Sequence, residues 1–214
     1  MVSLGTLAAF AAASLVLIAV PGPSVAYILT TTLRHGRAVG LAATLGIETG
    51  YLAHVAGTVL GVSALIAASA QAFTVLKVAG AAYLLWLAVR AWRARTPGTL
   101  AELGASSAAP PSRRSAFLRA LPIGVLNPKT AIFYLAFLPQ FVRPDAGPAW
   151  LQLVVLGVTF IGLATVVDAQ WALFGGGLRR LLPDLRMRVL DRIGSVTMAL
   201  LAVVALRSTR RAVG

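Results

Sequence analysis

Two acidic residues, Glu48 and Asp168, stand inside long apolar stretches of the chain. Glu48 follows Arg37 by eleven residues, and Asp168 precedes Arg179 by eleven residues. In a helix this spacing places each carboxyl group ~16 Å from the basic end, near the middle of a ~30 Å hydrocarbon core. An ionised group there costs at least ~2.5 kcal/mol, so it normally faces a cavity or a partner. The spacing predicts carboxyl groups that carry protons or bind an ammonium group, with structural pairing to Lys129 as the alternative.

Lys129 is one of two lysines in the chain, and it follows Pro128 in the middle of an apolar stretch. Lys77, the other lysine, lies near the end of its own stretch and can extend its side chain to the membrane surface. Lys129 has no such route. We therefore expect Lys129 to bind a substrate carboxylate or to neutralise one of the two buried acids.

Two further apolar stretches are interrupted, one by Pro21-Gly22-Pro23 and one by Asn127-Pro128. Proline removes a backbone donor and glycine permits unusual backbone angles, so both sequences predict broken helices. Counted from Arg34 and Arg119, both breaks lie ~14–20 Å from the same membrane edge. Matched breaks in two halves are typical of a transport site, whereas two ordinary proline kinks are the alternative. The candidate substrate-binding residues are Pro21, Gly22, Pro23, Ser24, Glu48, Asn127, Pro128, Lys129 and Asp168.

The stretch that contains Glu48 has two features that suggest structure rather than chemistry. A stripe of glycines at helical spacing predicts a surface on which a neighbouring helix packs, and it consists of Gly46, Gly50, Gly57 and Gly61. His54 is a lone histidine, for which a hydrogen-bonded structural role is favoured over a proton relay.

These residues must be positioned by helices that cross a membrane. The chain has 214 residues, of which 58% are apolar and 12% charged, against about 25% charged residues in a soluble domain. Its mean hydropathy is +0.85. Apolar stretches long enough to span a bilayer occupy approximately residues 4–33, 38–70, 73–92, 116–142, 149–177 and 189–206. The sequence predicts an all-α integral membrane bundle of six helices, the first and fourth of them broken.

The basic residues predict the orientation of these spans. The first, third and fifth gaps and their edges hold thirteen arginines, while the other side holds Arg143 and three arginines of the C-terminal tail. Because basic loops stay in the cytoplasm, the odd loops are predicted to be cytoplasmic and both termini external. This distribution also accounts for the net charge of +13 without nucleic-acid binding.

The chain resembles itself at an offset of 114 residues. Residues 75–93 and 189–207 share eight identities in nineteen positions, although apolar helices also match by chance. A true repeat would divide the chain into two three-helix repeats, residues 1–92 and 116–214, joined by a cytoplasmic linker at residues 93–115. An odd number of helices in each half makes the repeats inverted, as in many secondary transporters.

Several motifs together resemble the LysE-type translocator family, the bacterial exporters of lysine, threonine, homoserine and related amino acids. The motifs are Val20-Pro21-Gly22-Pro23, Gly36-Arg37 with Gly40 and Gly46, the segment from Lys77 to Leu84, the segment from Asn127 to Ala131, and the segment from Phe137 to Phe141. Ser24 and Glu48 depart from the family pattern, where asparagine and aspartate are frequent. The resemblance implies an efflux carrier in the bacterial inner membrane that exports amino acids or close derivatives and is driven by protons, with another small metabolite as an alternative substrate.

Two other classes of function are weaker alternatives. An exporter of metal cations would have two histidines, three methionines and no cysteine for ligands, which is a poor set for a soft metal. An intramembrane metalloprotease would need an H-E-x-x-H motif, and neither His35 nor His54 supplies one. The predicted partners are therefore a small amino acid, protons and the lipid bilayer, with no cofactor and no nucleic acid. Whether two copies form a homodimer is left open.

Overall fold

The computed structural model describes residues 2–19, 21–62, 70–93 and 111–181, and seven single positions from Val189 to Val203. Every regular element in this part of the chain is helical, which confirms the all-α prediction. The α-helices are α1 (Leu4–Ile18), α2 (Pro23–His35), α3 (Arg37–Gly57), α5 (Ala70–Arg93), α7 (Arg113–Val125), α8 (Pro128–Ile132) and α9 (Ala149–Leu181). Shorter π- and 3₁₀-helical segments are η1 (Thr58–Val62), η2 (Phe133–Phe137), η3 (Leu138–Phe141) and η4 (Pro144–Ala146).

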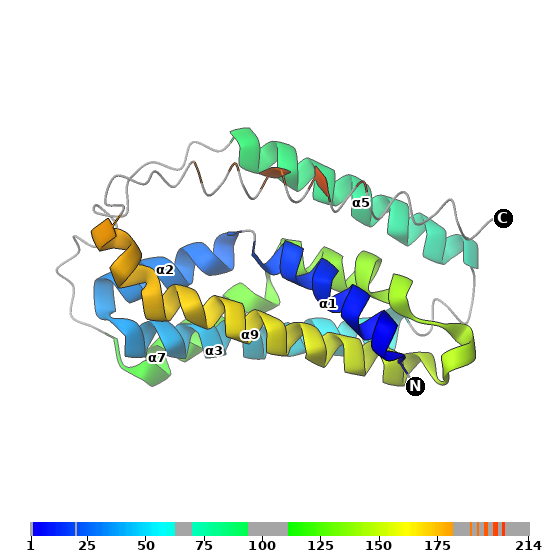
Figure 1. Ribbon diagram of the computed structural model, residues 1–214, viewed down its shortest axis with the longest axis horizontal. Coiled ribbons are helices and arrows are strands. Elements are labelled where there is room, and N and C mark those ends of the chain that lie inside the picture. Colours follow the sequence, from blue (N-terminus) through cyan, green and yellow to red (C-terminus); the bar gives the residue numbers. More distant parts are fainter. Residues whose placement is uncertain are drawn as a thin grey trace.

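The helices run roughly along the long axis of the molecule (Figure 1). The long helix α9 passes beneath both α1 and α2, while α5 lies along one side of the bundle (Figure 1). α2 and α3 run in opposite directions and are joined at Gly36, whose φ of 86° favours glycine. The chain therefore passes back and forth along the axis, as a bundle of membrane spans requires.

Three parts of the described chain have the length and apolar composition of a membrane span. α9 has them alone over Ala149–Gly177, 29 residues that include an 18-residue window with a mean hydropathy of 2.2. The other two are bent pairs, α1 with α2 and α7 with Pro128–Phe141, at angles of 59° and 45°. Both predicted helix breaks are thus observed. The predicted sixth span and most of the predicted linker fall on residues outside the described part, so the count of six and the inverted repeats stay predictions.

α3 and α7 pack backbone against backbone. A Cβ atom added to Gly46 would collide with the carbonyl group of Phe117, and one added to Gly124 would collide with that of Ile47. Gly50 is equally close to the backbone of α7. Small residues let two helices approach in this way within a membrane.

Only half of the predicted glycine stripe makes this contact, because Gly57 and Gly61 have open space where a Cβ atom would lie. We expect Gly46→Ala to lower the free energy of unfolding by about 1–3 kcal/mol, since the facing backbone must move. Gly57→Ala is the matched control and should be neutral or slightly stabilising, because alanine is the better helix former. Thermal unfolding of the purified variants measures both. An equal effect of the two substitutions would contradict the close contact.

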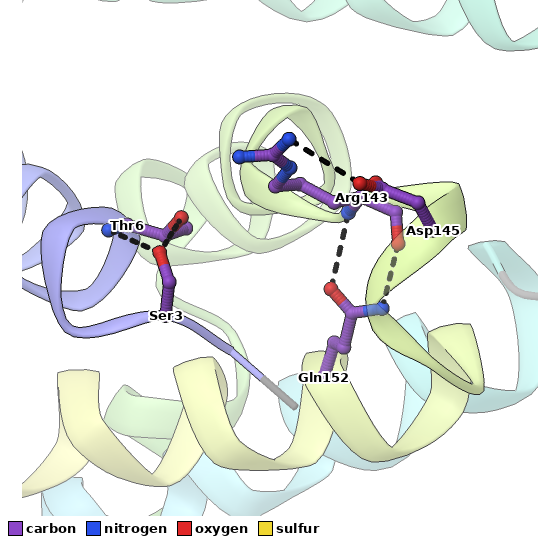
Figure 2. Close-up of polar contacts among 5 residues, drawn as sticks. All are labelled: Ser3, Thr6, Arg143, Asp145 and Gln152. Atoms are coloured by element: carbon purple, nitrogen blue, oxygen red, sulfur yellow. Dashed lines mark hydrogen bonds and ion pairs between the residues drawn. The ribbon is translucent and has the colours of Figure 1, made fainter.

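Polar contacts fix the end of the bundle where α1 and α9 begin (Figure 2). Ser3 Oγ accepts a hydrogen bond from the backbone N–H of Thr6 at 3.1 Å and thereby caps α1. The buried Gln152 donates to the carbonyl of Arg143 at 2.9 Å and accepts from its N–H at 3.0 Å. Arg143 also pairs with Asp145 at 3.4 Å in an exposed ion pair. The loop that follows η3 is therefore tied to the first turn of α9.

Candidate functional site

The two helix breaks meet midway along the bundle, where the chain passes from α1 to α2 (Figure 1). A small cavity between them is lined by both breaks, by α3 and by α9. Its lining residues are Ile18, Gly22, Ser24, Val25, Tyr51, Asn127, Lys129, Thr130, Phe160, Ala164 and Asp168. The cavity volume is about 10 Å³, which is room for about one water molecule.

Five of the nine predicted site residues line this cavity, namely Gly22, Ser24, Asn127, Lys129 and Asp168. The predicted prolines set the ends of the helices around it, since Pro23 and Pro128 are the first residues of α2 and α8. Pro21 directly precedes Gly22, the N-cap residue of α2. Glu48 is buried next to Asp168. The structure thus brings all nine residues to one region.

At the first break, a side chain of the second half completes the backbone hydrogen bonding. Pro21 has no N–H, so the carbonyl of Leu17 lacks the donor that a continuous helix would supply four residues later. Lys129 Nζ donates to this carbonyl oxygen at 3.1 Å. The Lys129 side chain lies against Gly22, because a Cβ atom there would be 3.5 Å from Nζ. Lys129 therefore joins α8 to the break between α1 and α2.

At the second break the roles of the two halves are reversed. Pro128 deprives the carbonyl of Gly124 of its usual donor, and His54 Nε2 donates to this carbonyl oxygen at 3.1 Å. The N–H of Asn127 donates to the same oxygen at 3.2 Å. His54 comes from α3, in the first half of the chain. The contact agrees with the predicted hydrogen-bonded structural role of His54.

Asn127 connects the two breaks directly. Its Nδ2 donates to Ser24 Oγ at 2.7 Å and to Tyr51 OH at 3.3 Å, and Ser24 Oγ lies 3.0 Å from the same hydroxyl. Its Oδ1 accepts from the backbone N–H of Lys129 at 3.0 Å and so caps α8. The start of α2 differs, because no side chain caps it at Gly22. Since Pro23 has no N–H and the N–H of Ala26 donates to the Gly22 carbonyl, the donors available to water or a ligand at this end are the N–H groups of Ser24 and Val25.

Tyr51 and Thr130 belong to this region but were not among the predicted site residues. Tyr51 follows Glu48 by three residues and so shares its helix face, which is a signal present in the sequence. Thr130 directly follows Lys129 in the motif after the second break. Phe160 and Ala164 line the apolar side of the cavity from α9, and nothing in their sequence context distinguishes them from other buried residues.

Glu48 and Asp168 form a buried acidic pair between α3 and α9. Each residue is 3% exposed, and the two carboxyl groups are close enough to interact, with the Lys129 ammonium group as their basic neighbour. Both carboxyl oxygens of Glu48 and the Oδ1 atom of Asp168 have no hydrogen-bond partner among the residues that the structure describes. Leaving such an atom buried and unpaired costs about 1–3 kcal/mol. The pair can therefore accept hydrogen bonds from a bound cationic group or hold a proton.

The chain is similar to known proteins over most of its length. The family model described as LysE type translocator matches residues 15–209. An uncharacterized membrane protein of Vibrio cholerae serotype O1 is 33% identical over 181 residues, which cover 83% of this chain and 85% of that protein. No solved structure gives a significant match.

Two further relatives carry functional names. The homoserine/homoserine lactone efflux protein of Salmonella typhimurium is 36% identical over 152 residues, which cover 71% of each chain. The leucine efflux protein of Klebsiella pneumoniae is 32% identical over 144 residues, which cover 67% of this chain and 66% of that protein.

Proposed function

Because this chain belongs to the LysE type translocator family, we propose that it exports small amino acids across the bacterial inner membrane through the cavity at the two helix breaks. The family and the named relatives indicate a membrane transporter rather than an enzyme, and they support amino acids as its substrates. The observation that carries the proposed site is the buried pair Glu48 and Asp168, of which Asp168 lines the cavity between the two helix breaks.

The site offers a different partner to each end of an amino acid. The substrate ammonium group would bind Asp168 and Glu48, which present acceptors without a donor. The substrate carboxylate would bind the uncapped start of α2, where backbone N–H groups and the helix dipole favour an anion. Lys129 borders the same space and can supply a counter-charge. Phe160 and Ala164 would contact an uncharged side chain.

The acidic pair also suggests how export is driven. Two neighbouring carboxyl groups in a buried site repel each other when both are ionised, so the pair readily holds one proton. Binding of a substrate ammonium group would replace this proton as the positive charge in the site. A proton and a substrate would thus bind the site alternately, so that inward movement of a proton is coupled to outward movement of a substrate.

Alternating access requires the site to open, since a cavity of about 10 Å³ does not admit an amino acid. We ascribe this opening to tilting of the helices around the breaks, in a bundle of six spans built from two inverted repeats, residues 1–92 and 116–214. The matched breaks between α1 and α2 and between α7 and α8 support this division. The arginine distribution supports a cytoplasmic linker at residues 93–115.

The topology has a direct test. A reporter fused within the linker at residues 94–115 should stay cytoplasmic, whereas one fused in the loop at residues 143–147 should be exported. Paired phosphatase and fluorescent-protein fusions distinguish the two locations. If both fusions report the same side, the six-span topology and the inverted repeats are wrong.

Export itself is best measured in everted membrane vesicles, in which an exporter moves its substrate inward. We expect uptake of labelled leucine or homoserine to exceed that of vesicles without the protein, and a protonophore to reduce it by at least about tenfold. Vesicles that instead accumulate divalent metal ions would favour the alternative of a metal exporter. Amino-acid uptake that the protonophore does not reduce would support amino-acid export and refute proton coupling.

A further inference from the structure

The ammonium group of Lys129 occupies the place that a substrate ammonium group would need. Lys129 is 7% exposed, and its Nζ atom donates to the carbonyl of Leu17 at the first helix break. Asp168 and Glu48 are its acidic neighbours. A carbonyl freed by a helix break and two carboxyl groups are the acceptors that a buried primary ammonium group requires. A cation of the chain itself thus already holds the Leu17 carbonyl and lies beside the two carboxyl groups.

The cavity is too small to hold a second ammonium group beside that of Lys129. With Lys129 in place, the remaining space holds about one water molecule. Gly22 leaves no side chain between the Lys129 ammonium group and the start of α2, because even a Cβ atom there would lie 3.5 Å from Nζ. A rotation of the Lys129 side chain would therefore free the Leu17 carbonyl and the space beside the two acids, and would bring the ammonium group toward the proposed carboxylate position.

We propose that the Lys129 ammonium group takes the position of the substrate ammonium group when no substrate is bound. An amino acid then displaces it and supplies a carboxylate as its new counter-charge. A plain amine could take over the acceptors but would bring no anion, so it would leave the displaced Lys129 ammonium group buried without a counter-charge. Lys129 therefore selects amino acids over amines that lack a carboxylate. That the displacing molecule is an amino acid rests on the proposed function. That Lys129 holds the position rests only on the contacts of Lys129.

The test removes the Lys129 side chain by substitution and supplies a small ammonium ion in its place. Methylammonium reproduces the end of the lysine side chain, so it should bind purified Lys129→Ala and raise its thermal stability in a saturable manner. The wild-type protein should respond only at concentrations at least about tenfold higher, because its own ammonium group fills the site. Tetramethylammonium carries the same charge but no N–H donor, and it should have no saturable effect on either protein.

The double variant Lys129→Ala with Asp168→Asn identifies the binding position, and it should lose the response to methylammonium. If Lys129→Ala accumulates poorly, methylammonium present during expression should raise its amount in the membrane severalfold, and tetramethylammonium should not. The inference is overturned if methylammonium neither stabilises nor rescues Lys129→Ala, if the wild type responds equally, or if the response survives Asp168→Asn. A failure of the proposed function would appear separately, as wild-type vesicles that transport no amino acid.

Discussion

Export should fall by at least about tenfold in Asp168→Asn and in Glu48→Gln, while both variants still accumulate in the membrane. Each amide keeps nearly the shape of the acid and can hydrogen-bond, but it cannot ionise. The unpaired oxygens of these two buried residues are the proposed acceptors for the substrate ammonium group and the proton. A tenfold loss corresponds to about 1.4 kcal/mol, which is modest for the loss of a charged hydrogen bond. Initial rates of uptake into everted vesicles, normalised to protein content, measure the effect.

The matched control is Asp145→Asn, the same chemical change in an exposed ion pair at the end of the bundle (Figure 2), and it should export normally. A purely structural role of the acids predicts a different pattern. Removing a carboxyl group that only neutralises Lys129 would strand a buried cation at about 3–5 kcal/mol and deplete the folded protein. The added change Lys129→Met would then restore the folded level. Stable variants that transport as the wild type does would contradict both the transport role and the structural role of the acidic pair.

Gly22→Leu should abolish export without reducing the amount of protein in the membrane. The backbone of Gly22 is extended, with φ of −127° and ψ of −167°, so a larger residue can adopt it. The substitution acts through volume, because a leucine side chain would extend into the cavity and against Lys129. Uptake into vesicles and the membrane level of the variant are measured together.

Two controls separate bulk at the site from bulk in general. Gly22→Ala should keep most of the activity, because a Cβ atom there makes only an ordinary contact of 3.5 Å with Lys129 Nζ. Gly57→Leu adds the same side chain to α3 where nothing lies within 4 Å, and it should export normally. Normal export by Gly22→Leu would mean that the first break is only a proline kink.

Covalent chemistry explains what could be predicted from the sequence. A proline lacks an N–H wherever it occurs, so Pro21 and Pro128 predicted breaks that the structure contains. The equal spacing of Glu48 and Asp168 from basic helix ends predicted a common depth, and the two residues are neighbours.

Contacts between distant segments were not predictable in the same way. Which side chain bonds to the carbonyl freed by each proline depends on how the helices pack, so the bonds of Lys129 to Leu17 and of His54 to Gly124 emerged only in three dimensions. The prediction that Gly57 contacts a neighbouring helix was wrong for the same reason. Helical spacing defines a face of the helix, but it does not show where the neighbouring helix ends its contact.

The contact between α3 and α7 has a consequence for the motion of the transporter. Backbones that touch through Gly46, Gly50 and Gly124 have no side chains between them that could slide or change rotamer. We expect these two helices to keep their mutual position during the cycle and to act as a fulcrum, even though they belong to opposite halves of the chain. The parts that tilt around this fulcrum are then α1, α2 and α9, which carry the first break and Asp168. A crosslink between α3 and α7 should consequently leave turnover intact, whereas one between α3 and α9 should arrest it.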